Sequence, residues 1–96
     1  MENQFGIRLR ELREAKNLLQ RQVASFLEID TPMLSKIERG ERMAKKNQVE
    51  QLAKILKCDL SELLTLWLAD QVYDIVKDEK NAHEVLKIVS QKIKHK

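Results

Sequence analysis

Apolar residues recur along this chain at intervals of three and four, the spacing that gathers them on one face of an α-helix. In the first part of the chain this pattern predicts a helix over residues 4–16, which Asn17 can end, and a shorter helix over 20–27. The inward positions are Phe5, Leu9 and Leu12 in the first helix and Val23, Ala24 and Leu27 in the second. These two helices are expected to share one hydrophobic core.

A third helix is predicted to follow a tight turn at residues 28–30. Asp30 or Thr31 can cap it, because short polar side chains accept hydrogen bonds from the free amides of a first turn. Pro32 suits that first turn, where the amide hydrogen it lacks would have no helical partner. The helix is expected to end near Arg39, with Gly40 supplying the stop.

Three further helices are predicted in the rest of the chain. The fourth carries the apolar stripe Val49, Leu52, Ala53 and Leu56. Asp59 stands three residues before Glu62, the spacing of a capping box, and predicts the start of a fifth helix. Asn81 and Glu84 repeat that spacing ahead of a sixth helix over about 82–94. The expected fold class is therefore all-α, a compact domain of five to six helices.

Composition supports this fold class and narrows the cellular setting. The 96 residues are 43% hydrophobic and 34% charged, and they include only two glycines and one proline. One cysteine excludes an internal disulfide and fits a reducing compartment. The N-terminus is polar, and the longest apolar stretch, residues 63–69, is too short to span a bilayer. We expect a cytoplasmic protein that does not enter membranes.

Charge is distributed unevenly along the chain. Residues 1–58 hold 12 Lys and Arg against 8 Asp and Glu, whereas residues 59–96 hold 6 against 7. The basic part is where a nucleic-acid-binding surface is to be sought. A surplus this small is common in proteins that bind no nucleic acid, so the charge alone does not decide the function.

Residues 20–39 match the steric pattern of a helix-turn-helix. Ala24 supplies the small side chain that is needed where the second helix of the motif crosses the first. The apolar residues that would hold the pair to the core are Val23, Leu27, Ile29, Leu34 and Ile37. The residues between them that are left to face a DNA groove are Thr31, Pro32, Met33, Ser35 and Lys36.

Three segments in this order and spacing resemble the phage-repressor and Cro-like regulators, the XRE-type helix-turn-helix family. They read RLRELREAKNLLQRQVA, MLSKIERGER and VEQLAKILKCDLSELL. The resemblance runs from about Phe5 to Leu64, close to two-thirds of the chain. It implies a repressor-like DNA-binding domain and a small stand-alone regulator, such as a restriction-modification controller.

The resemblance also implies roles for individual residues. Gln20 corresponds to a position that contacts backbone phosphate, and Thr31, Pro32 and Lys36 to positions that face base edges in the major groove. The whole set expected to contact double-stranded DNA is Gln20, Arg21, Thr31, Pro32, Met33, Ser35, Lys36, Arg39, Arg42, Lys45 and Lys46. The last four form a basic run suited to phosphate, which sets affinity rather than sequence preference.

Two residues depart from the family pattern. Glu28 stands in the turn where the family usually has glycine, and a left-handed backbone there would cost about 1 kcal/mol relative to glycine. Pro32 stands at a base-facing position but cannot donate a hydrogen bond, which leaves direct readout to fewer side chains. Asp30 would in addition repel phosphate unless its carboxylate caps the third helix. These features bear on the base contacts rather than on the fold.

No residues suggest catalysis, a metal site or a cofactor. Cys58 has no second cysteine and is interpreted as a small core residue. His83-Glu84 matches half of a metalloprotease motif, but the residue that would be the second histidine is Lys87. We therefore expect that the protein is not an enzyme and that His83 lies on the surface.

The C-terminal third predicts an association surface. Residues 1–64 are assigned to the DNA-binding core and residues 65–96 to a helical extension of the same domain. The fifth helix has apolar residues on two sides, and those expected to face its own core are Leu60, Leu64, Trp67, Leu68 and Ile75. The second stripe, Leu66, Ala69, Tyr73 and Val76, is the predicted homodimer interface. The alternative is that the sixth helix covers this stripe within one chain.

Together these features predict a regulator of transcription that binds a palindromic operator as a homodimer and represses or controls its own or a nearby operon. A two-fold dimer doubles the contacts of one recognition helix. Two alternatives remain open. One is an antitoxin whose C-terminal helices hold a toxin, and the other is a protein-interaction adaptor that reuses the fold without binding DNA.

Overall fold

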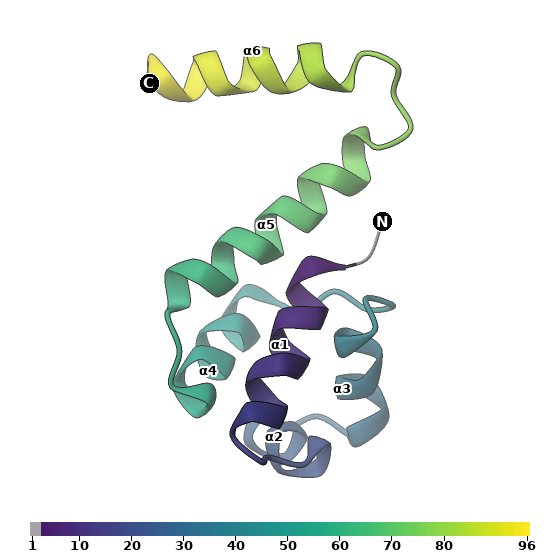
Figure 1. Ribbon diagram of the computed structural model, residues 1–96, viewed down its shortest axis with the longest axis vertical. Coiled ribbons are helices and arrows are strands. Elements are labelled where there is room, and N and C mark those ends of the chain that lie inside the picture. Colours follow the sequence, from purple (N-terminus) through teal and green to yellow (C-terminus); the bar gives the residue numbers. More distant parts are fainter. Residues whose placement is uncertain (1–2) are drawn as a thin grey trace.

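The computed structural model describes residues 3–96, which form six α-helices and, over that range, no β-strand (Figure 1). The helices are α1 (Gln4–Ala15), α2 (Gln20–Leu27), α3 (Thr31–Glu38), α4 (Lys46–Leu56), α5 (Leu60–Val76) and α6 (Ala82–Lys94). The predicted all-α fold class is confirmed, and each predicted helix is found. None of these helices is long and apolar enough to cross a membrane.

Two of the three helix caps expected from the sequence are formed. The Asp30 carboxylate accepts the amide of Met33 at 2.8 Å, and Pro32 occupies the first turn of α3. Asp59 accepts the amide of Ser61 at 3.0 Å and so begins α5. The expected capping role of Asn81 is wrong, because its side chain makes no capping hydrogen bond to α6.

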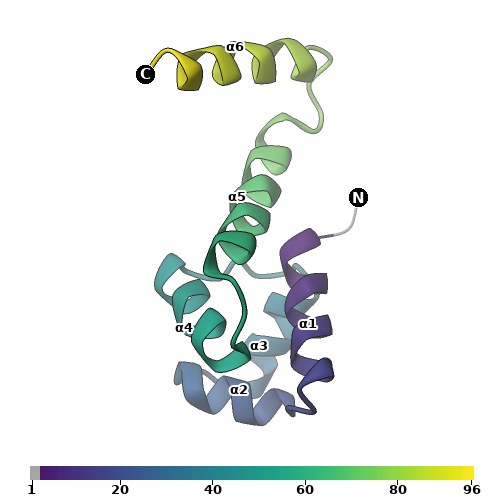
Figure 2. The ribbon, with the colours of Figure 1, turned by 60° about the vertical axis from the view of Figure 1, so that its left-hand side comes forward.

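Helices α1 to α4 surround one hydrophobic core, and the first half of α5 closes it (Figures 1 and 2). The fully buried large side chains at its centre are Leu9, Val23, Leu34, Ile37, Val49, Leu52, Leu56 and Leu63. Every inward position predicted for the helix-turn-helix belongs to this cluster or packs against it. Burial of these side chains supplies most of the favourable free energy of folding, because each is worth about 1.5–3 kcal/mol.

Two polar contacts fasten α5 to the rest of the core. The Trp67 indole donates to the carbonyl oxygen of Ala44 at 2.8 Å and so ties α5 to the loop between α3 and α4. The Asp70 carboxylate accepts the amides of Gln4 and Phe5 at 3.1 and 2.9 Å, so it satisfies the free donors at the start of α1. The proposed division at residue 64 thus falls inside one continuous helix that contacts the core as far as Asp70.

In the second half of α5 the apolar residues do not face the way that the sequence predicted. Leu68 and Ile75, expected to face the core, are 52% and 76% exposed. Leu66, assigned to a free stripe, packs against the core, and Val76 from the same stripe is only 8% exposed. Because α5 is apolar on nearly every side, periodicity alone could not fix its rotation, which the burial of Leu63 decides.

A buried ion pair holds the end of α3 against α1 and the start of α2. Arg13 and Glu38 have side chains that are 11% and 3% exposed, and Arg13 Nε donates to a Glu38 carboxylate oxygen at 2.6 Å. The same guanidinium donates to the carbonyl oxygen of Leu18 at 2.8 Å, and the Gln20 amide donates to Glu38 at 3.0 Å. The hydrogen bond to Glu38 raises the pKa of Arg13, so the cation is further stabilised in the fold.

Gly6 lets α1 approach this same end of α3 closely. A Cβ at Gly6 would lie 2.8 Å from the carbonyl oxygen of Ile37 and closer still to that of Glu38. Both oxygens belong to the backbone, so they cannot move aside as a flexible side chain would. Any larger residue at position 6 would push α3 away from α1.

The turn between α2 and α3 has the left-handed backbone anticipated for Glu28, with a φ of 58°. The Glu28 and Ile29 amides donate back to the carbonyl oxygens of Ser25 and Ala24 at 3.1 and 3.0 Å. The turn therefore has the shape that the family usually makes with glycine, at a conformational cost to Glu28.

Glu38→Gln tests the buried ion pair. The substitution keeps the side-chain volume but leaves the Arg13 cation without its counter-charge, so we expect a loss of about 3 kcal/mol in the free energy of unfolding, measured by urea denaturation. Glu41→Gln is the matched control, since Glu41 forms an ion pair with Arg39 on the surface, and its unfolding midpoint should not change. Equal losses in the two variants would contradict the assigned role of Glu38.

Glu28→Gly tests the strain in the turn. Glycine adopts positive φ without a steric penalty, so this variant is expected to be more stable by about 0.5–1 kcal/mol in thermal or urea unfolding. Glu50→Gly, the same exchange at an exposed helical position of α4, should instead lose about 1 kcal/mol. A loss of stability in both variants would show that Glu28 is not strained.

Candidate nucleic-acid interface

Helices α2 and α3 form a compact helix-turn-helix. Ala24 is buried in the core that the two helices share, as expected for an inward position. The hydrogen-bonded turn at residues 28–30 and the Asp30 cap set the angle at which α3 leaves α2 (Figure 2). On its inner side α3 buries Leu34 and Ile37 in the core, which leaves its opposite side for solvent.

The outer side of α3 carries most of the residues expected to read bases. Thr31, Pro32 and Lys36 are all exposed, and they follow one another along this side of the helix. Ser35 is half-buried. Met33 is also half-buried and packs against the core, so it is less available to a ligand than its neighbours are.

The basic residues continue from the end of α3 into the following loop and α4. Arg39, Arg42, Lys45 and Lys46 are all exposed. Arg21 is exposed as well, in the first turn of α2 at the other end of the motif. Exposed cationic side chains thus precede and follow α3 in the chain.

Arg39 is held by two neighbours that the sequence did not single out as its partners. Its Nε donates to a Glu41 carboxylate oxygen at 2.6 Å, and its Nη1 donates to the Ser35 hydroxyl. The hydrogen bond between Arg39 and Glu41 raises the pKa of Arg39 and lowers the pKa of Glu41. A phosphate that approached Arg39 would have to compete with the Glu41 carboxylate.

Gln20 and Asp30 are both engaged within the protein. One N–H of the Gln20 amide donates to Glu38, and the second remains for an external acceptor because an amide group carries two. The Asp30 carboxylate caps α3, as the sequence suggested, so part of its negative charge is neutralised by the helix terminus.

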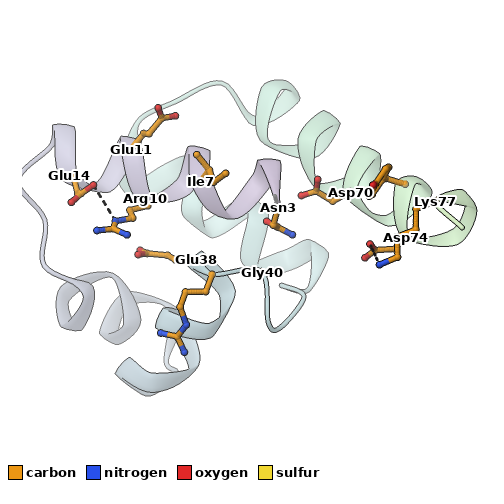
Figure 3. A pocket seen from close by; sticks show the side chains of 12 residues that line it. Asn3, Ile7, Arg10, Glu11, Glu14, Glu38, Gly40, Asp70, Asp74 and Lys77 are labelled. Atoms are coloured by element: carbon orange, nitrogen blue, oxygen red, sulfur yellow. Dashed lines mark hydrogen bonds and ion pairs between the residues drawn. The ribbon is translucent and has the colours of Figure 1, made fainter. Parts of the chain in front are cut away.

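A groove of 640 Å³ lies between α1, the end of α3 and α5 (Figure 3). Two ion pairs line it, Arg10 with Glu14 at 3.4 Å and Lys77 with Asp74 at 3.5 Å. Its other charged groups, such as Glu38 and Asp70, are engaged by partners elsewhere in the fold. Over residues 3–96 no group of His, Cys, Asp and Glu is placed to hold a metal ion.

The lone cysteine and the candidate histidine have ordinary surroundings. Cys58 is half-buried and packs against the core, where burial raises the pKa of its thiol and so disfavours the reactive thiolate. His83 is exposed on α6, as predicted. Neither residue adds chemistry to the basic surface of the helix-turn-helix.

Comparison with known proteins agrees with this geometry. Residues 4–66 match the family model of a helix-turn-helix domain. Over 61 residues the chain is 39% identical to an uncharacterized HTH-type transcriptional regulator, RghRB, of Bacillus subtilis (strain 168). That match covers 62% of this chain but only 44% of RghRB, so the chain corresponds to less than half of that relative.

A solved structure is also similar. The crystal structure of the restriction-modification controller protein C.AhdI from Aeromonas hydrophila is 38% identical, with a TM-score of 0.59. The match covers 64% of this chain and 88% of C.AhdI. The family model spans all of α1 to α4, and so the whole helix-turn-helix, and it covers α5 as far as Leu66. The chain therefore belongs to the helix-turn-helix family of DNA-binding regulators, in the phage-repressor and Cro-like class that its sequence resembles.

Proposed function

We propose that this protein binds an operator as a two-fold dimer, with α3 in the major groove of each half-site, and so controls transcription of its own or a nearby operon. The observation that carries the proposal is the exposed side of α3: its inner side is fixed in the core, its outer side presents Thr31, Pro32 and Lys36, and exposed basic residues precede and follow it in the chain. An α-helix held in this way can enter a major groove without rearrangement.

Base recognition is assigned to few side chains. Lys36 can donate to guanine O6 or N7, and the Thr31 methyl group can contact the methyl group of thymine. Pro32 offers only an apolar contact because it has no N–H. Met33 contributes less than the sequence implied, since it packs against the core. We therefore assign most of the sequence preference to Lys36 and Thr31.

Phosphate binding is assigned to the two ends of the motif. Gln20 and Arg21 lie at the start of α2, where free backbone amides and the helix dipole favour an anion. The same role is assigned, beyond α3, to Arg42, Lys45 and Lys46. Arg39 can bind phosphate as well once its ion pair with Glu41 is broken. The Arg13–Glu38 pair supports both ends, because it joins the end of α3 to the Gln20 side chain.

The two relatives support the regulatory part of the proposal. One is named as a transcriptional regulator and the other as a restriction-modification controller. Control of a nearby operon is consistent with both names. We infer repression rather than activation from the resemblance to phage repressors noted in the sequence.

A salt-titrated binding assay tests the proposal. The probe is the DNA upstream of the protein's own gene, with random DNA as competitor. We expect specific binding that saturates at two chains per site and weakens steeply as salt rises. Saturation at one chain per site would contradict the dimer. The lack of binding to any DNA at low salt would contradict the whole proposal and support the adaptor alternative.

Two alanine substitutions separate base readout from phosphate attraction. Lys36→Ala should relax specificity at one base pair, at a cost of about 1–3 kcal/mol for the preferred sequence. Arg42→Ala should weaken binding to all sequences alike and reduce the slope of log affinity against log salt by about one. Lys54→Ala on α4, outside the basic run, serves as the control and should change neither quantity. Identical effects of Lys36→Ala on all sequences would contradict its assignment to a base.

Glu41→Gln tests whether Glu41 restrains Arg39. Removal of the carboxylate should free the guanidinium for a phosphate, so affinity should rise and the salt slope should steepen by about 0.9. Glu50→Gln makes the same charge change elsewhere and measures the effect of net charge alone. The gain should disappear in the double variant Glu41→Gln with Arg39→Ala. An equal gain in Glu50→Gln would show that the Arg39–Glu41 contact has no part in binding.

A further inference from the structure

The loop between α3 and α4, residues 39–45, carries three members of the basic run. Arg39 pairs with Glu41 at the start of this loop. Arg42 and Lys45 are exposed, and neither forms an ion pair within residues 3–96. They are therefore the cations of the loop that a phosphate can reach without displacing a carboxylate. Where they stand relative to α3 depends on how the loop is held.

Both ends of the loop are fixed by the helices that it joins. The Glu41 amide donates to the carbonyl oxygen of Lys36 at 2.9 Å, which closes the end of α3. The Lys45 amide donates to the Gln48 side chain at 2.8 Å, which begins α4. Neither contact involves residues 42–44, so the position of these residues is decided by another part of the molecule.

One hydrogen bond from α5 holds the middle of the loop. Within residues 3–96, the only hydrogen bond of residues 42–44 is the one that Trp67 Nε1 donates to the carbonyl oxygen of Ala44 at 2.8 Å. Ala44 is only 2% exposed, so this carbonyl oxygen is shielded from water and would lose its partner if the indole donor were removed. The Trp67 ring packs against the core, so the donor is itself held in place.

Open space beneath the loop gives it room to move. A cavity of 240 Å³ separates residues 40–44 from α5, and Arg42 is among the loop residues that line it. The residues that line it from α5 are Trp67, Asp70, Gln71 and Asp74. Asp70 is engaged by the amides at the start of α1, whereas the Asp74 side chain is 69% exposed and has only a 3.5 Å contact with Lys77. In a loop without its contact to Trp67, Asp74 would compete with a phosphate for Arg42.

We propose that Trp67 is a positioning residue for DNA binding, whose indole N–H holds the loop between α3 and α4 so that Arg42 is presented to a phosphate beside α3. The inference rests on the proposed function and adds to it a residue of α5, outside the helix-turn-helix. From the sequence Trp67 was expected only to face the core. Trp67 acts through Arg42, because Arg42 lies in the segment whose one hydrogen bond it supplies and lines the same cavity.

Trp67→Phe tests the proposal, because it removes the N–H and keeps an aromatic ring. Its affinity for the DNA upstream of the protein's own gene and for random DNA should fall alike, by about 5–10-fold. The slope of log affinity against log salt should fall by about 0.9, the value for one phosphate contact. Thr65→Val removes a side-chain donor from an exposed position of the same helix and should change neither quantity. A purely structural role would lower the folded fraction without changing the slope, so a folded Trp67→Phe with the wild-type slope would overturn the proposal.

Two double variants show whether Trp67 acts through Arg42. Added to Arg42→Ala, Trp67→Phe should cause no further loss of affinity, because the side chain that it positions is already gone. Added to Arg21→Ala, at the start of α2 and outside the loop, it should cause its full loss, so that the two losses multiply. Losses that multiply in both double variants would overturn the assignment to Arg42.

An isosteric analogue covers the case in which phenylalanine leaves a void that unfolds the protein. In 3-benzothienylalanine a sulfur atom takes the place of the indole N–H, and the bicyclic ring is otherwise the same. Trp67 is the only tryptophan of the chain, so the analogue can be introduced at this position alone. It should show the same losses of affinity and slope. An analogue that binds DNA like the wild-type protein would overturn the proposal.

Limited trypsin digestion separates this inference from the proposed function, because it needs no DNA. A loop released from Trp67 should be cut more readily, so the rate of cleavage after Arg42 should rise several-fold in Trp67→Phe. Cleavage after Lys80, an exposed residue in the turn between α5 and α6, is the internal reference. An unchanged ratio of the two rates would overturn the inference even if the wild-type protein binds DNA. A raised ratio in a protein that binds no DNA would support the contact between Trp67 and the loop and contradict the proposed function.

Discussion

The ion pair between Arg13 and Glu38, with the Gln20 amide that binds Glu38, joins three helices at one buried point, and the position of α3 depends on it. Each charge is costly to bury alone, and each is stabilised by the other and by further hydrogen bonds to Leu18 and Gln20. Gly6 lets the α1 backbone come close to the same end of α3. The end of α3 is therefore fixed by backbone contact as well as by charge, and helix α3 presents its outer side on a rigid support.

The fixed position of α3 also determines which side chains the candidate DNA-binding surface presents. Because Leu34 and Ile37 are held in the core, Thr31 and Lys36 necessarily point outward, and the basic run continues from the fixed end of α3. Gln20 belongs both to this support and to the surface, since its amide reaches Glu38 with one N–H and leaves the other free. The Arg39–Glu41 contact gives the surface a cation whose availability is controlled by a neighbouring carboxylate.

The C-terminal helices show the opposite situation, in which burial within one chain is incomplete. Trp67 and Asp70 fasten the first part of α5 to the core, and beyond them the helix continues into solvent with apolar residues on its outer face. Helix α6 adds further exposed apolar side chains, and none of its residues is buried. The stable part of the fold thus supports an extension whose apolar surface exceeds what one chain can cover.

The six helices, the helix-turn-helix and the basic run could be predicted from the amino-acid sequence, because they depend on local spacing and on caps such as Asp30. The sequence also pointed to strain at Glu28, because glutamate stands where the family usually has glycine. The partners of Glu38, Glu41 and Asp70 became known from the folded chain alone, because their contacts join residues that no periodicity relates. The tertiary structure likewise decided the rotation of α5, because a helix that is apolar on nearly every side has no preferred inner face until Leu63 and Trp67 find their places in the core.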